Sequence, residues 1–150
     1  MIVIDTNALL ILIIGQIDAN LIESHKRTSI YEPQDYYDLL RITGNFENLL
    51  ILPNIWTEVD NLLNNFTGEQ KYHYVLKFTE IVKLSTEKYV ATINSAEAAS
   101  FYDLGLTDSL LLILAKENKL LMTSDSTLSD YAIASGINVY DIVKNRNVRF

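Results

Sequence analysis

The sequence predicts an α/β fold with a mostly parallel central sheet that helices cover on both faces. Short apolar segments such as residues 2–5 alternate along the chain with longer segments of helical periodicity, and this alternation is typical of parallel sheets. The short segments are apolar on both faces, as strands buried on both sides are. With 150 residues, 49% of them hydrophobic, we expect residues 1–150 to form a single domain.

The chain begins with a buried strand and a strongly apolar helix. Residues 2–5 are short and rich in β-branched side chains, which predicts the strand. Residues 8–14 follow as a helical segment, which we expect to stop at Gly15. Residues 16–32 are polar and predict no element with a clear pattern.

The next two helices have start and stop signals. Pro33 suits a first helical position and Gly44 a position just beyond a helix end, which predicts a helix between them. Residues 48–53 form a second buried strand that runs into a helix at Pro53, and we expect this helix to extend to about Asn65.

The middle of the chain carries two capping-box patterns. Residues 67–70 open a helix whose apolar stripe continues beyond residue 80. Residues 88–93 fit either a strand or a loop. Residues 94–97 predict the start of another helix, running to about Leu104 and ended by Gly105.

The last part returns to strand and helix in turn. Thr107 can cap a helix over residues 108–117, and residues 119–125 form a strand that ends in a carboxylate. A helical face follows and ends at Gly136, and residues 137–142 are the last predicted strand.

Composition narrows the function classes. The net charge is −7, from 12 basic and 19 acidic residues, which argues against a broad nucleic-acid-binding surface but leaves a localised one open. The absence of cysteine excludes disulfides, thiolate catalysis and cysteine-based zinc sites. No secretory leader is evident, and the apolar run is far shorter than the ~20 residues of a membrane span. We therefore expect a cytoplasmic protein without membrane contact.

Four acidic residues are predicted to face one site. Asp5 and Asp125 each follow a strand, and ligands of parallel sheets bind beyond the carboxyl ends of the strands. Glu58 flanks the apolar stripe of its helix, and Asp108 shares a helical face with Leu111.

Each acid also has a structural explanation. Asp5 could accept backbone hydrogen bonds at a turn, Asp125 could be an N-cap, Asp108 could favour a helix start, and Glu58 could pair with a lysine. Four uncompensated carboxylates gathered together would be costly. A divalent cation removes that cost, and oxygen-only ligands favour Mg²⁺ or Mn²⁺.

These residues and their order resemble PIN-domain ribonucleases, including toxins of toxin–antitoxin pairs. The segments that carry the resemblance are "VIDTN", "LPNIWTEVDNLL", "LGLTDSLLLILA" and "LMTSDSTL". Some members carry a further acid soon after the fourth, where this chain has Ser126. The resemblance implies a three-layer α/β/α sandwich and a Mg²⁺- or Mn²⁺-dependent endoribonuclease. It also implies that Asp5, Glu58, Asp108 and Asp125 form the catalytic metal site.

Four further residues are candidates for binding RNA. Asn7 could hold the ribose, a water on the metal, or only the turn in which it lies. His25, Lys26 and Arg27 form the densest basic spot; they could position phosphates or belong to a solvated loop. The expected partners are RNA and, for a toxin, an antitoxin protein, with a homodimer left open.

Two other functions compete with the nuclease hypothesis. A non-catalytic PIN-like module would bind RNA or protein and use the acids structurally. A phosphate-handling domain such as a receiver or phosphatase is disfavoured, because Glu58 would have no role in it.

Overall fold

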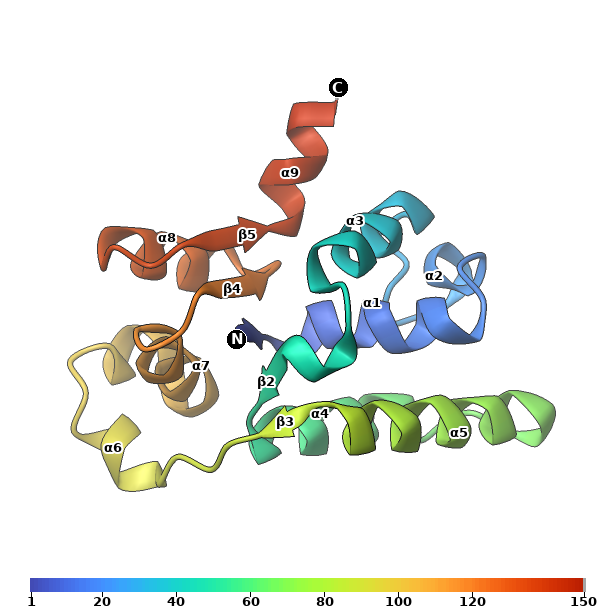
Figure 1. Ribbon diagram of the computed structural model, residues 1–150, viewed down its shortest axis with the longest axis horizontal. Coiled ribbons are helices and arrows are strands. Elements are labelled where there is room, and N and C mark those ends of the chain that lie inside the picture. Colours follow the sequence, from blue (N-terminus) through green and yellow to red (C-terminus); the bar gives the residue numbers. More distant parts are fainter. Residues whose placement is uncertain (150) are drawn as a thin grey trace.

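The computed structural model describes residues 1–149 and has a five-stranded parallel sheet at its centre (Figure 1). The strand order is β3-β2-β1-β4-β5, and every neighbouring pair is parallel. The strands are β1 (Ile2–Ile4), β2 (Leu49–Ile51), β3 (Thr86–Glu87), β4 (Leu120–Thr123) and β5 (Val139–Asp141).

Helices cover both faces of the sheet, which makes the fold the expected three-layer α/β/α sandwich. In Figure 1, α1 to α5 lie on one side of the sheet and α6, α7 and α8 on the other, and α9 extends beyond β5. The helices are α1 (Thr6–Ile17), α2 (Leu21–Ser24), α3 (Pro33–Thr43), α4 (Pro53–Leu63), α5 (Gly68–Leu84), α6 (Thr92–Ala96), α7 (Phe101–Ala115), α8 (Ser126–Ala134) and α9 (Ile142–Arg149), with a 3₁₀ turn η1 at Phe46–Asn48.

The order of the strands changes direction at β1. The chain moves from β1 to β2 and β3 on one side, and then crosses to β4 and β5 on the other. Val3 of β1 is paired with Leu50 of β2 and with Leu121 of β4, so β1 is the central strand. Such a reversal leaves a crevice beyond the carboxyl ends of the two strands that flank it. Residues just after β1 and β4 therefore lie at this crevice.

Helix α1 is buried on all sides, and this corrects the boundary expected at Gly15. Residues 8–15 are all buried, and the helix continues through Gly15 to Ile17. A Cβ atom on Gly15 would lie 2.1 Å from the ring of Tyr36 in α3. Glycine is therefore present for the close approach of α3, and it does not end the helix.

The segment between β3 and α7 also differs from the expectation. Residues 88–93 contain no strand, because β3 lies before them and α6 begins at Thr92. The pattern at 94–97 opens no helix, since Asn94 is already inside α6. Gly105, with φ 79° and ψ −172°, interrupts the helical backbone as expected, so α7 consists of two helical stretches joined at this kink.

Several element ends are confirmed within a few residues. Pro33 and Pro53 are the first residues of α3 and α4, and Gly44 caps α3 with a positive φ of 67°. Helices α2 and α9 have no counterpart among the predictions. No helix in the described residues combines the length and apolar character needed to cross a bilayer.

Candidate active site

Asp5 is held at the carboxyl end of β1, where α1 begins. It caps α1 by accepting the amide N–H of Ala8 at 2.9 Å, and its other oxygen accepts the hydroxyl of Thr123 and the amide of Ser124. Burial raises the pKa of Asp5 to about 6, although these hydrogen bonds oppose the rise and the charge of Asp125 adds to it. The structural role proposed for Asp5, as an acceptor at the turn, is therefore confirmed.

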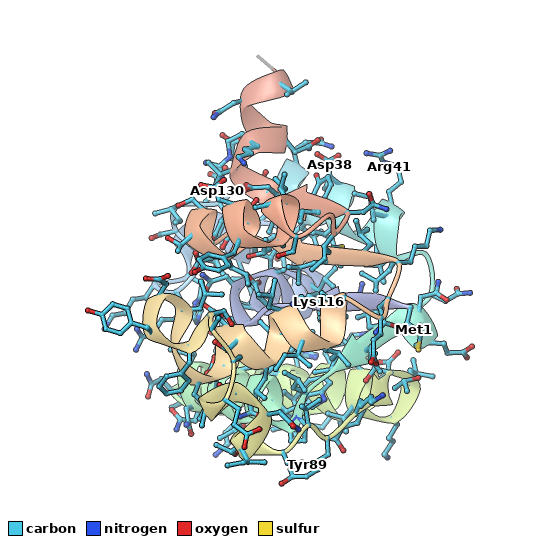
Figure 2. The ribbon with its side chains drawn as sticks, turned by 90° about the vertical axis from the view of Figure 1, so that its left-hand side faces the viewer. Met1, Asp38, Arg41, Tyr89, Lys116 and Asp130 are labelled. Atoms are coloured by element: carbon cyan, nitrogen blue, oxygen red, sulfur yellow. The ribbon has the colours of Figure 1, made fainter. Side chains whose placement is uncertain are left out.

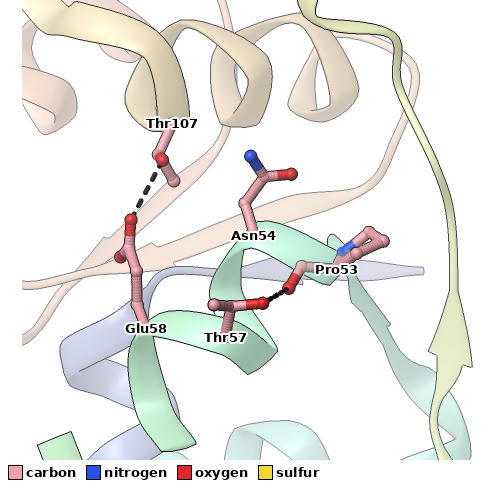
Figure 3. A pocket seen from close by; sticks show the side chains of 5 residues that line it. All are labelled: Pro53, Asn54, Thr57, Glu58 and Thr107. Carbon is pink, nitrogen blue, oxygen red and sulfur yellow. Dashed lines mark hydrogen bonds between the residues drawn. The ribbon is translucent and has the colours of Figure 1, made fainter. Parts of the chain in front are cut away.

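Glu58 reaches the same region from α4 and is fixed by two threonines. One carboxylate oxygen accepts the hydroxyl of Thr6, and the other accepts the hydroxyl of Thr107 at 3.0 Å (Figure 3). Thr6 belongs to α1 and Thr107 to α7. Glu58 of α4 therefore links α4 to α1 and α7. The two threonines orient its carboxylate, and no lysine forms an ion pair with Glu58 in the described residues.

Asp108 and Asp125 complete the group. The pKa of Asp108 is raised to about 7. Burial is the largest cause, and the negative charges of Asp125, Asp5 and Glu58 add to it. Asp125 is exposed and caps α8, where it accepts the amide N–H of Leu128 at 3.0 Å. The N-cap role expected for Asp125 is confirmed, and its charge still acts on Asp108.

One cavity brings the four predicted acids together. It has a volume of about 270 Å³ and lies at the carboxyl ends of β1 and β4, where the strand order reverses. We call this cavity the acidic pocket. Its lining residues are Asp5, Thr6, Asn7, Glu58, Leu62, Asp108 and Asp125.

The acidic pocket fits a hard cation by its chemistry and less well by its present geometry. All of its charged groups are carboxylates, and no ion pair in residues 1–149 involves any of the four. Yet among these residues no group of three or more His, Cys, Asp or Glu side chains is arranged to hold a metal ion as it stands. Hydroxyl and amide hydrogens bind oxygens of Asp5, Glu58 and Asp125, so ligation would require some of these carboxylates to turn.

Of the residues expected to bind RNA, Asn7 is the one at the acidic pocket. Its side-chain amide donates to the hydroxyl of Ser124 at 3.3 Å. His25, Lys26 and Arg27 lie between α2 and α3 and are not among the residues that line the pocket.

The basic segment has one packed member and two exposed ones. The ring of His25 lies 5.0 Å from that of Phe66, between centroids, and burial together with the charge of Arg27 lowers the pKa of His25. Lys26 and Arg27 are exposed, and neither forms an ion pair within the described chain. His25 therefore packs against Phe66, whereas Lys26 and Arg27 are exposed at the surface.

Two residues near the acidic pocket carry no sequence signal that could have identified them. Thr6 binds Glu58, which is 52 positions away, and Tyr31 donates its hydroxyl to Ser124, 93 positions away, at 2.7 Å. Arg146 of α9 lies 5.8 Å above the ring of Tyr31 and pairs with the buried Asp35 at 2.8 Å. Such contacts depend on the tertiary arrangement, which local patterns do not reveal.

Comparisons with known proteins give little further information. No family model matches the chain, and no curated protein matches it. A solved structure described as a domain of a functionally unknown protein from Methanocaldococcus jannaschii DSM 2661 is 21% identical, with a TM-score of 0.43. The match covers 93% of this chain and 89% of the other.

Proposed function

We propose that this protein is a Mg²⁺- or Mn²⁺-dependent endoribonuclease that hydrolyses RNA phosphodiester bonds in the acidic pocket. The observation that carries the proposal is that Asp108 lines one cavity with three carboxylates from other elements, Asp5, Glu58 and Asp125. A fold that only needed helix caps would not require Glu58 and Asp108 to share a cavity with the two capping acids.

The order of the acids along the chain gives further support, because it resembles that of PIN-domain ribonucleases. A role as the toxin of a toxin–antitoxin pair, with an antitoxin protein as partner, belongs to the same proposal. It rests on this resemblance alone.

The residues of the pocket have separate tasks in this proposal. Asp5, Glu58, Asp108 and Asp125 would hold the cation, which supplies Lewis-acid polarisation of the phosphodiester and neutralises its charge. Thr123 and the Ser124 amide keep Asp5 in place, and hydroxyls orient Glu58. The exposed Asp125 and Asn7 form the side of the pocket that RNA can approach.

A second function is favoured by the hydrogen bonds themselves. Three of the four carboxylates already have hydroxyl or amide donors, so a non-catalytic module that binds RNA or protein could use them to stabilise the fold. This alternative predicts no metal-dependent change in stability and no cleavage.

The test is cleavage of a mixed RNA pool in Mn²⁺, Mg²⁺ or EDTA. We expect cleavage in either metal and none in EDTA, and a loss of about 100-fold or more in Asp5→Asn and Asp108→Asn. Asparagine is also a good N-cap, so Asp5→Asn keeps the start of α1. The exposed Glu47 in η1 provides the control Glu47→Gln, which removes the same charge outside the pocket.

Thermal unfolding with and without Mn²⁺ separates the two functions. A cation that binds only the folded chain raises the melting temperature, and the rise should disappear in Asp108→Asn but not in Glu47→Gln. A wild-type protein that neither cleaves RNA nor gains stability from Mn²⁺ would support the non-catalytic module.

A further inference from the structure

A second cavity adjoins the acidic pocket through Glu58. Its volume is about 370 Å³, and it lies between the start of α4 and α7 (Figure 3). Its lining residues are Pro53, Asn54, Thr57, Glu58 and Thr107. We call this second cavity the amide pocket. It is within the size range of small-ligand sites, which begins at ~300 Å³.

Glu58 forms the wall between the two cavities. One carboxylate oxygen of Glu58 accepts a hydrogen bond from the hydroxyl of Thr107, which lines the amide pocket. The other accepts a hydrogen bond from the hydroxyl of Thr6, which lines the acidic pocket. A ligand with two joined parts could therefore occupy both cavities, one part on each side of this carboxylate.

The two cavities differ in chemistry. The acidic pocket has four carboxylates, whereas Glu58 is the one charged side chain that lines the amide pocket. Pro53 gives the amide pocket an apolar wall, and the hydroxyl of Thr57 donates to the carbonyl of Pro53. A neutral, partly apolar group suits this cavity, and an anion does not.

Asn54 provides the polar recognition group of the amide pocket. Figure 3 shows its side chain pointing from α4 toward the helix that carries Thr107. No hydrogen bond to its side-chain amide is formed within residues 1–149. A primary amide offers a donor and an acceptor side by side, which is the pattern that pairs with the edge of a nucleobase.

We propose that the amide pocket binds the nucleoside next to the scissile phosphate and that Asn54 reads the edge of its base. This inference rests on the proposed nuclease function, because it is the phosphodiester in the acidic pocket that places a nucleoside beside Glu58. Single-stranded RNA is recognised mainly through the edges and faces of unstacked bases. Pro53 gives the base an apolar surface, and Asn54 gives it a hydrogen-bonding pair.

The experiment measures binding without cleavage. Four pentanucleotide RNAs that differ only in the central base, with uncleavable methylphosphonate linkages on both sides of that base, are titrated in Mn²⁺ into the wild type, Asn54→Ala and Asn54→Gln. The control is Asn65→Ala, which removes the same amide from an exposed position beyond the end of α4. Circular dichroism and the Mn²⁺-dependent melting temperature check that the fold and the acidic pocket are retained.

We expect the wild type to bind the four RNAs with different affinities. The spread should shrink by about tenfold in Asn54→Ala, because a good amide–base pair discriminates by roughly 1–3 kcal/mol, which corresponds to ~5- to 150-fold. Asn54→Gln should change which base is preferred, since the amide moves outward by one methylene. Asn65→Ala should behave as the wild type.

The outcomes distinguish this inference from the nuclease proposal. If Asn54 sets the base preference but the wild type does not cleave RNA in Mn²⁺, the base site stands and the nuclease function is wrong. If the wild type cleaves and Asn54→Ala keeps the same preference, the nuclease stands and the base site is wrong. A wild type that binds all four RNAs equally, or none of them, also overturns the base site.

Discussion

The pKa of Asp108 reflects how closely the carboxylates of the acidic pocket lie together. Burial and the charges of Asp125, Asp5 and Glu58 bring its pKa to about 7, against about 3.9 in an unfolded chain. Between pH ~4 and ~7 the folded protein therefore binds a proton that the unfolded chain has lost. Stability falls as the pH rises through this window and becomes constant above it.

The first prediction concerns Asp108→Asn in EDTA. The variant should be more stable than the wild type at pH 7.5, by roughly 1–2 kcal/mol after allowance for solvent screening of a half-exposed group. Its stability should also depend less on pH between 4.5 and 7.5. Urea unfolding at the two pH values measures both effects.

Glu47→Gln is the control for this prediction, because Glu47 is exposed and lies outside the acidic pocket. The opposite contribution of His25, whose pKa is lowered, is the same in every protein compared and cancels. An Asp108→Asn protein no more stable than Glu47→Gln at pH 7.5 would mean that Asp108 is not crowded.

Helix ends show what local sequence can and cannot predict. Pro33, Gly44 and Pro53 mark real boundaries, because their backbone preferences act within one or two residues. Gly15 was misread as a stop, since its role depends on the ring of Tyr36, which is 21 positions away. The pattern at 94–97 predicted a helix start that is too late, since α6, which packs on α7, begins at Thr92.

Gly105 lies at the kink of α7, three residues before Asp108, which lines the acidic pocket. Its φ of 79° and ψ of −172° are accessible almost only to glycine. A Cβ at this position would meet no atom within 4 Å, so the cost of a substitution comes from the backbone alone.

The second prediction compares Gly105→Ala with Gly136→Ala. Gly136 also has a φ of 79° and open space around it, but it follows α8 and does not line the acidic pocket. Each variant should lose about 1–2 kcal/mol of stability. In Gly105→Ala the first turn beyond the kink should shift, so that the pH dependence attributed to Asp108 weakens. Gly136→Ala should keep it.

Urea unfolding across pH 4.5–7.5 measures this difference without any assay of activity. Equal flattening of the pH dependence in both glycine variants would show that the kink has no special role in placing Asp108.

At the scale of the whole molecule, the parallel topology brings the acids together. Asp5 and Asp125 follow adjacent strands, so the prediction that they share an edge needed only the alternation of strands and helices. Glu58 and Asp108 were assigned from helical faces, and both line the pocket. The hydroxyls of Thr6 and Tyr31 could not be assigned, because their partners are set by how helices pack around the sheet.

The distribution of charge over the molecule leads to the last prediction. A protein with a net charge of −7 repels RNA at long range, so exposed cations near the acidic pocket should matter for binding. Lys26 and Arg27 are exposed cations, and Arg27 is four residues from Tyr31, whose hydroxyl donates to Ser124 beside Asp5. The Cα atoms of Arg27 and Tyr31 are therefore no more than about 14 Å apart.

Replacing both Lys26 and Arg27 with alanine should weaken RNA binding about equally for all sequences, because phosphate contacts carry no base information. The slope of log affinity against log salt should become shallower by at most ~0.7 for each lost contact with single-stranded RNA. The control removes two exposed lysines that line neither the acidic pocket nor the amide pocket: Lys116, at the end of α7 (Figure 2), and Lys119, whose amide donates to the carbonyl of Met1. Since both double variants lose two positive charges, a general charge effect would change their salt slopes equally. A local phosphate contact changes the slope of the Lys26/Arg27 variant alone, whereas equal slopes would assign this segment to the solvated loop.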